Sequence, residues 1–203
     1  MPPRVRRSVE EARTIILDAA EEVLRDAGPA GLRIKDVAER AGMAHPNVLH
    51  HFGSREGLLR ELTVRTMERI TSRVVRAIGK SMLTTPADRV ETLARVLDEV
   101  YEGDQGRLLA WLLISGRVER IEKPNLEPLV KITHAWRTAA IGPADEDDTR
   151  RLILLGSLAL LGDAIAGAGM VESLELGAGE EGRRGFRTWL AGFILEQIER
   201  EPY

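Results

Sequence analysis

The sequence of 203 residues contains no cysteine. This absence excludes a disulfide framework, a thiolate zinc site, an iron–sulfur cluster and a cysteine nucleophile. Aromatic residues make up only 4% of the chain, and no long run alternates apolar and polar residues with a period of two. Apolar residues recur instead at the spacing of helices. We therefore expect an all-α protein with no metal and no cofactor.

The sequence also lacks a clear membrane span. Its most apolar segment, residues 152–168, has 17 residues, contains Asp163 and three glycines, and is shorter than the ~20 residues that a span requires. The basic start of the chain is followed by charged residues and not by an apolar stretch, so no secretory signal is predicted. We expect a cytoplasmic protein that does not enter a membrane.

Charge is distributed unevenly along the chain, although the net charge is only −3. Residues 1–80 carry 15 Lys and Arg against 11 Asp and Glu, so the rest of the chain is strongly acidic. A basic head on an acidic body is typical of a phosphate-facing module joined to a domain with another role. We expect two domains, residues 1–55 and 56–203.

The first part of the chain is predicted to form four helices, over residues 8–27, 34–41, 45–51 and 54–78. Gly28 ends the first helix, Gly42 closes the second, and Pro46 is acceptable in the first turn of the third. Ala38 and Gly42 are expected to be small because two helices cross closely at the turn. Two short helices joined by a glycine-containing turn have the layout of a helix-turn-helix.

The remaining chain is predicted to form five helices. Four lie over residues 85–102, 108–118, 126–141 and 149–168, and the fifth follows a glycine-rich loop at 177–185 and ends near residue 200. Acidic residues 145–148 precede the fourth of these helices, which is the end where negative charge is favourable. The second half is therefore expected to be helical throughout.

Three segments carry a specific family signal: Ile16-Leu17-Asp18-Ala19-Ala20, Asp36-Val37-Ala38-Glu39-Arg40-Ala41-Gly42, and His50-x-Phe52-x-Ser54-Arg55-Glu56-x-Leu58-Leu59. In this order and spacing, residues 13–59 resemble the N-terminal domain of the TetR family of bacterial transcriptional regulators. The rest of the chain matches that family only in length and helical character. The resemblance implies a sequence-specific DNA-binding regulator, a repressor released from its operator by a small molecule.

The resemblance also implies which residues contact double-stranded DNA. The residues expected to face bases are Ala44, His45, Pro46 and Asn47. Those expected near the phosphates are Arg33, His50, His51 and Arg55. Asn47 can make a bidentate contact to adenine. The chain departs from the family pattern at three positions, where Leu49 and His51 replace common aromatic residues and Arg33 replaces a Thr that often caps the second helix. The phosphate contacts are therefore altered.

The two C-terminal helices are candidates for a dimer interface because each has a wide apolar stripe. The interface candidates are Leu158, Phe186, Trp189, Leu190, Phe193 and Ile194. The alternative is that both helices fill the core of a single chain. The family resemblance favours a homodimer, which would bind an operator with inverted-repeat symmetry.

The helices over residues 106–141 mix large apolar groups with a few polar ones, which is typical of a small-molecule pocket. The mixture comprises Trp111, Leu112, Ser115, Leu129, Thr133, His134 and Trp136, and all but Leu129 are taken as candidate contacts of an unknown effector. Core packing would produce the same pattern, because helical spacing does not separate a cavity wall from a packed layer.

Two other functions are left open. One is a small helical enzyme or ligand-binding protein that uses His134 with Asp163 or a nearby Glu as an acid–base pair. No nucleophile motif, phosphate loop or metal-spaced cluster supports it, and we expect no catalytic residues. The other is a dimer that has lost DNA binding, which Leu49 favours because leucine cannot donate a hydrogen bond to a phosphate.

Overall fold

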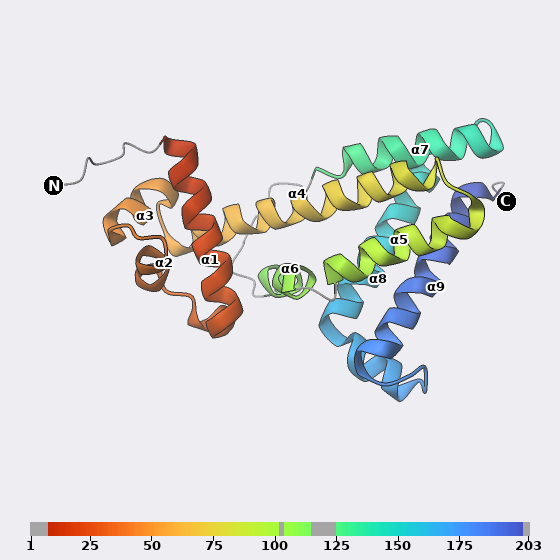
Figure 1. The fold of residues 1–203 in the computed structure, drawn as a ribbon. Coiled ribbons are helices and arrows are strands. Elements are labelled where there is room, and N and C mark those ends of the chain that lie inside the picture. The colour runs from red at the N-terminus through yellow and green to blue at the C-terminus, as the bar shows by residue number, and fades with distance from the viewer. Residues whose placement is uncertain (1–7, 102–103, 115–124, 201–203) are drawn as a thin grey trace. The chain divides into compact units, whose positions relative to one another are not determined.

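The computed structural model describes residues 8–101, 104–114 and 125–200. Within these ranges the chain forms nine α-helices and no strand (Figure 1). This confirms the all-α expectation. The chain divides into two compact units, Met1–Thr66 with Trp111–Glu122, and Met67–Ala110 with Lys123–Tyr203.

Two helices contribute to both units, α4 (Arg55–Ser81) and α6 (Asp104–Ile114). The first unit extends past the expected boundary at residue 55, because the opening turns of α4 belong to it. Leu58, Leu59 and Leu62 of these turns are completely buried. The division into domains 1–55 and 56–203 stays a prediction.

The first unit begins with α1 (Val9–Gly31), which starts at a capping box. The hydroxyl of Ser8 accepts from the N–H of Glu11 at 3.1 Å, and the Glu11 carboxylate accepts from the N–H of Ser8 at 2.7 Å. These two bonds satisfy donors that a helix start leaves unpaired. The helix is kinked at Gly28, which has a φ of 65°. The predicted end at residue 27 is therefore a kink, and helical turns continue to Gly31.

The helix-turn-helix consists of α2 (Ile34–Arg40) and α3 (His45–Phe52). Val37, Val48 and Phe52 are buried between these helices and α1. Gly42 in the turn has a φ of 63°, and a β-carbon added to it would meet nothing within 4 Å. The expectation that Gly42 is small for close helix crossing is wrong. Its role is to adopt a left-handed backbone that other residues rarely adopt.

The second unit contains α5 (Pro86–Tyr101), α7 (Glu127–Ile141), α8 (Glu146–Ser173) and α9 (Gly179–Glu199). Helix α9 packs against α8, α5 and α7 (Figure 1). The Asp145 carboxylate caps α8 by accepting from the N–H of Asp147 at 2.9 Å. The acidic start of this helix was expected, but α8 begins at residue 146 and not at 149.

Helix α8 is also longer than predicted, with 28 residues. It is the one helix among the described residues that is long and apolar enough to cross a membrane by length and composition. The argument that this segment is too short is therefore wrong. Its Asp163 is buried, however, and paired with two arginines of α9. The core helix of a soluble protein passes the same test of length and composition.

The glycine-rich segment at 177–185 is not a loop throughout, because α9 begins at Gly179. A β-carbon on Gly182 would lie 3.0 Å from the carbonyl carbon of Gly177 and 3.0 Å from Cγ2 of Val171. Gly182 therefore allows the start of α9 to pack tightly on the end of α8. The glycines were interpreted as loop residues, whereas at least Gly182 is a packing residue inside a helix.

A buried ion cluster joins α5, α8 and α9. Arg187 is completely buried, and it donates to the carboxylates of Asp98 at 2.6 Å, Asp163 at 2.9 Å and Glu180 at 2.5 Å. Arg183 donates to both carboxylate oxygens of Asp163, at 2.9 and 3.1 Å. Each buried guanidinium of this cluster thus has carboxylate partners, as buried charges require.

Candidate functional site

The N-terminal half of α3 is exposed. Its cap residue Ala44 and the following His45, Pro46 and Asn47 are all open to solvent, whereas Val48 is buried. The side-chain amide of Asn47 has no hydrogen-bond partner within the described ranges. It can therefore offer one donor and one acceptor to the edge of a base. The four residues predicted to face bases lie together on this exposed turn.

The C-terminal half of α3 is held in place by Arg13 of α1. One guanidinium nitrogen donates to the carbonyl of His51 at 2.8 Å, and the other bonds Glu61 of α4 at 2.7 Å. The guanidinium also lies 4.7 Å from the centre of the Phe52 ring. His50 is exposed, and its ring meets the half-buried His51 ring edge-on at 5.7 Å. Helix α3 is thus anchored at its C-terminal end, while its N-terminal turn is exposed.

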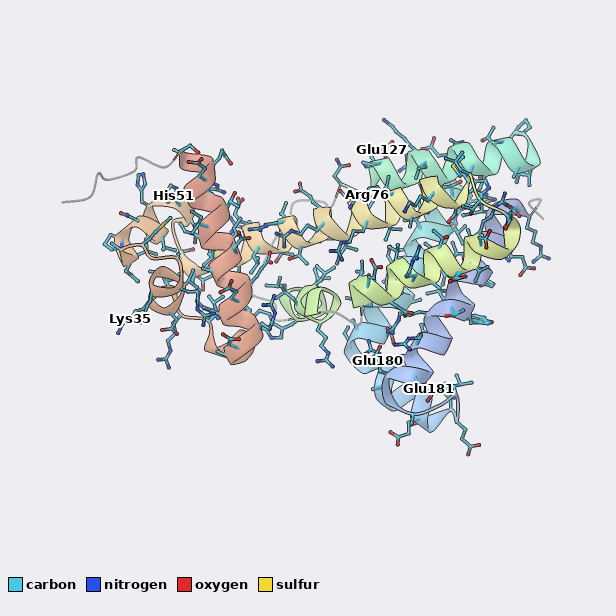
Figure 2. All side chains as sticks on the ribbon, viewed as in Figure 1. Lys35, His51, Arg76, Glu127, Glu180 and Glu181 are labelled. Atoms are coloured by element: carbon cyan, nitrogen blue, oxygen red, sulfur yellow. The ribbon has the colours of Figure 1, made fainter. Side chains whose placement is uncertain are left out.

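The two arginines expected at phosphates have different surroundings. Arg33 is the exposed cap residue of α2 and makes no side-chain cap bond. Arg55 is half-buried, and its Nε donates to the carbonyl of Leu32 at 2.9 Å. Lys35, which the sequence analysis did not select, projects from the first turn of α2 into solvent (Figure 2). Its place two residues after Arg33 at a helix start was the available signal.

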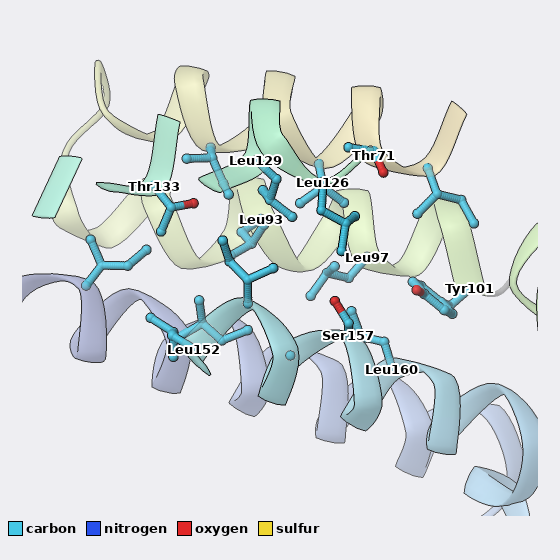
Figure 3. A pocket seen from close by; sticks show the side chains of 17 residues that line it. Thr71, Leu93, Leu97, Tyr101, Leu126, Leu129, Thr133, Leu152, Ser157 and Leu160 are labelled. Carbon is cyan, nitrogen blue, oxygen red and sulfur yellow. The ribbon is translucent and has the colours of Figure 1, made fainter. Parts of the chain in front are cut away.

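The second unit contains a cavity of about 100 Å³ between α4, α5, α7, α8 and α9 (Figure 3). Most of its lining residues are leucine, isoleucine or valine, and none is charged. The polar side chains in the lining are those of Thr71, Tyr101, Thr133 and Ser157. Such a lining is suited to a largely apolar molecule with few hydrogen-bonding groups.

Thr133 lies at one end of the cavity and Tyr101 near the other (Figure 3). The Thr133 side chain is 2% exposed, and its hydroxyl has no hydrogen-bond partner. By contrast, the buried hydroxyls of Thr63 and Thr66 donate to carbonyls one turn earlier, each at 2.8 Å. Burial, together with the charge of Asp163, raises the pKa of Tyr101 to about 12.

Of the residues expected at the ligand pocket, Thr133 lines this cavity, as does Leu129. Trp111 and Leu112 belong to the first compact unit. Ser115 lies outside the described residues. The assignment of Trp111, Leu112 and Ser115 to a ligand stays a prediction.

Trp136 and His134 lie on α7 but do not line the cavity. Trp136 is buried, with the guanidinium of Arg89 5.3 Å from the centre of its ring. His134 is half-buried, and its Nδ1 lies 3.1 Å from the hydroxyl of Thr149. Because the carboxylate of Asp163 is bound by arginines of α9, the structure does not bring it together with His134 as an acid–base pair.

The candidate dimer residues fall into two groups. Trp189 is 62% exposed and stacks between Phe186 and Phe193, at centroid distances of 6.2 and 5.5 Å. Leu158 of α8 is likewise exposed. On α8, Leu154, Leu155 and Ile165 add further exposed apolar side chains.

Leu190 and Ile194 point into their own chain. Leu190 is 3% exposed. Ile194 lines the cavity and would contact a β-carbon on Gly156 at 3.1 Å. The core reading thus applies to Leu190 and Ile194, whereas the interface at Leu158, Phe186, Trp189 and Phe193 stays a prediction.

Comparison with known proteins gives a consistent result. Residues 16–62 match the family model for bacterial regulatory proteins of the tetR family. The HTH-type transcriptional repressor Rv3405c of Mycobacterium tuberculosis (strain ATCC 25618 / H37Rv) is 30% identical over 155 residues, which cover 74% of this chain and 70% of that protein.

Solved structures share the fold. A TetR-family regulator from Mesorhizobium loti MAFF303099 has a TM-score of 0.67 at 15% identity, covering 95% of this chain and 96% of that one. The multidrug binding protein EbrR, complexed with imidazole, has a TM-score of 0.51 at 24% identity, covering 88% and 93%.

The relatives are helix-turn-helix transcriptional regulators and not enzymes. Helix α3, the recognition helix of the helix-turn-helix, lies within the matched residues 16–62. The chain is a helix-turn-helix transcriptional regulator and belongs to the TetR family of bacterial regulatory proteins.

Proposed function

We propose that this regulator is a cytoplasmic repressor that binds an inverted-repeat operator as a homodimer and is released by a small molecule. The observation that carries the proposal is the exposed turn His45–Asn47, held on a buried core by Val48 and Phe52. A rigid helix with a free N-terminal half is what base readout in a major groove requires. The name of the Mycobacterium relative, a repressor, agrees with it.

On DNA, Asn47 and His45 read base edges, and Arg33, Lys35 and His50 neutralise phosphates. All five are exposed. Phosphate contacts of this kind position the protein and make its affinity depend on salt, whereas base contacts give specificity. Arg55 also contacts a phosphate in this proposal. Its side chain is half-buried, and its hydrogen bond to the carbonyl of Leu32 supports the fold.

The homodimer forms through α8 and α9. The exposed Leu158 and Trp189, with the half-buried Phe186 and Phe193 stacked on Trp189, supply an apolar surface on the single chain. A two-fold pair of such surfaces buries them and presents two recognition helices. Each recognition helix then reads one half-site, with the half-sites ~34 Å or a multiple of it apart.

Release depends on α4, a continuous helix of 27 residues. It begins at Arg55, three residues after α3 ends, and its second half supplies Ile70, Val74 and Ile78 to the cavity. A ligand that fills the cavity favours another position of α4 and so changes the spacing of the recognition helices. Typical couplings of ~1–3 kcal/mol reduce operator affinity about 5- to 150-fold.

A gel-shift assay against the DNA upstream of the protein's own coding sequence tests this function. At ~150 mM salt we expect specific binding to one site with inverted-repeat symmetry and much weaker binding to shuffled DNA of equal length. Equal affinity for every duplex would contradict the regulator proposal and favour a dimer that has lost specific DNA binding.

A further inference from the structure

Two buried polar groups lie one turn apart on the same face of α7. Thr133, at the cavity, has a hydroxyl without a partner. Arg137 is 5% exposed, and its Nε also has no partner. Residues four apart on a helix are neighbours on its surface. Two buried polar atoms at neighbouring positions on α7 therefore both lack a hydrogen-bond partner within the described ranges.

Among the described residues, Arg137 lacks a counter-ion as well. Its guanidinium makes a long hydrogen bond, from Nη1 to the hydroxyl of Thr149 at 3.3 Å. No carboxylate of the described chain forms a salt bridge with it. Arg183 and Arg187 are equally buried and are both paired with Asp163. A buried cation without compensation is costly, so the exception at Arg137 indicates an anionic partner.

Arg137 does not itself line the cavity, but its guanidinium contacts a residue close to the cavity's end. Thr149, which it contacts, is one turn before Ile153 on α8, and Ile153 lines the cavity. Figure 3 shows Thr133 and Leu152 at this same end, with Tyr101 and Leu160 toward the opposite end. The eight helical steps from Leu152 to Leu160 span ~12 Å along the helix axis. The cavity is thus elongated, with its polar groups of α7 at one end.

An occupant that satisfies this arrangement has two parts. One is a hydrocarbon body about 10 Å long, because the walls are apolar and carry no charge. The other is a carboxylate, because it accepts hydrogen bonds from both the Thr133 hydroxyl and the Arg137 guanidinium and neutralises the buried charge. We propose that the effector is such an amphiphilic monocarboxylate, with its head group at Thr133 and Arg137. This inference rests on the proposed effector-binding function of the cavity.

The test compares three probes of equal chain length, octanoate, octan-1-ol and methyl octanoate, by calorimetric titration of the full-length protein. We expect octanoate to bind about 10-fold tighter or more than either neutral probe, since hydrogen bonds to charged groups are the stronger ones. Equal or weaker binding of octanoate would overturn the inference.

Two variants identify the head-group site. Thr133→Val and Arg137→Met both keep the side-chain volume near its present value and are expected to abolish the preference for octanoate, while octan-1-ol binding changes less than about 2-fold. Arg137→Met is also expected to raise the thermal unfolding midpoint of the unliganded protein, because it removes an unpaired buried charge. Arg95→Gln, an exposed cation of α5, is the matched control and should change nothing. An unchanged octanoate preference in Arg137→Met would place the carboxylate elsewhere.

The operator assay separates the two proposals. Specific DNA binding without octanoate selectivity refutes the carboxylate site alone. Selective, Arg137-dependent octanoate binding by a protein that binds no specific DNA refutes the repressor function and leaves the site intact. Selective binding that leaves operator affinity unchanged refutes octanoate-type acids as effectors.

Discussion

The guanidinium Nε of Arg55 donates to the main-chain carbonyl of Leu32 at 2.9 Å. This bond ties the first turn of α4 to the residue that immediately precedes Arg33, the cap of α2. The family resemblance implies a phosphate contact for Arg55, but its position also makes it part of the frame that orients the helix-turn-helix.

Arg55→Ala is therefore expected to act on stability and on DNA binding together. The Leu32 carbonyl loses its donor, which costs about 1–3 kcal/mol in the free energy of unfolding. Affinity should fall by a similar factor for all DNA sequences. Urea unfolding and operator titration measure the two effects, and Arg60→Ala, an exposed cation of α4, should stay within about 0.5 kcal/mol of the parent stability. Full stability in Arg55→Ala would contradict the framing role.

Asn47→Ala is expected to relax sequence preference and leave the fold intact. Asn47 is exposed and its amide bonds nothing in the described protein, so its loss should cost ~1–3 kcal/mol only against the operator. Titrations of operator and single-base variants at one salt concentration measure this. Lys35→Ala is the contrasting control, because loss of a phosphate contact weakens all sites and lowers the salt slope by about 1. The prediction fails if Asn47→Ala weakens every sequence equally.

Trp189→Asp is expected to produce a folded monomer. The Trp189 side chain is exposed on the single chain, so a charge there is tolerated by the fold but not by an apolar two-fold interface. Sedimentation gives the mass, and circular dichroism gives the helical content. Leu190→Asp, one residue later, places a charge in the buried core and should unfold the chain instead. A dimer that persists in Trp189→Asp would locate the interface elsewhere.

Stability should fall in alkaline solution because of Tyr101. An unfolded Tyr ionises near pH 10, whereas burial and the nearby Asp163 charge raise the folded pKa to about 12. The folded state thus holds a proton that the unfolded state loses, so the contribution is complete below pH 10 and is lost as the pH rises to 12. A difference of two pKa units corresponds to about 3 kcal/mol. Tyr101→Phe should remove this part of the slope, and parallel curves for both proteins would refute it.

The helix-turn-helix was predictable because its signals are local. Ser8 with Glu11, the glycine turn at Gly42 and Pro46 near a helix start each specify a boundary within a few residues. Which residues of α3 face outward was implied by the family resemblance. The pattern did not predict the hydrogen bond from Arg55 to the carbonyl of Leu32, because the two residues are 23 positions apart in the sequence.

The cavity was not predictable in the same way. The sequence suggested helices over residues 106–141, but the walls also come from α4, α5, α8 and α9. Apolar periodicity indicates that one face of a helix is buried. It does not indicate whether that face packs against another helix or lines a cavity. The unpaired groups of Thr133 and Arg137 become visible only when the partners of every buried polar atom are known.

The buried ion cluster was missed for a related reason. Arg183 and Arg187 lie in a segment that was interpreted as loop and as an apolar stripe, and their partner Asp163 was counted as a mark against a membrane helix. A lone Asp in a long apolar helix was the available signal, since a buried carboxylate needs cations from elsewhere in the chain.

The same cluster constrains how the protein can diverge. Arg187 holds carboxylates of Asp98, Asp163 and Glu180, which belong to three helices. Loss of one partner leaves a buried charge uncompensated, whereas replacing the whole set by apolar residues is tolerated. Substitutions at these positions are therefore expected to occur together. Among related sequences the ion cluster should be either complete or replaced entirely by apolar side chains.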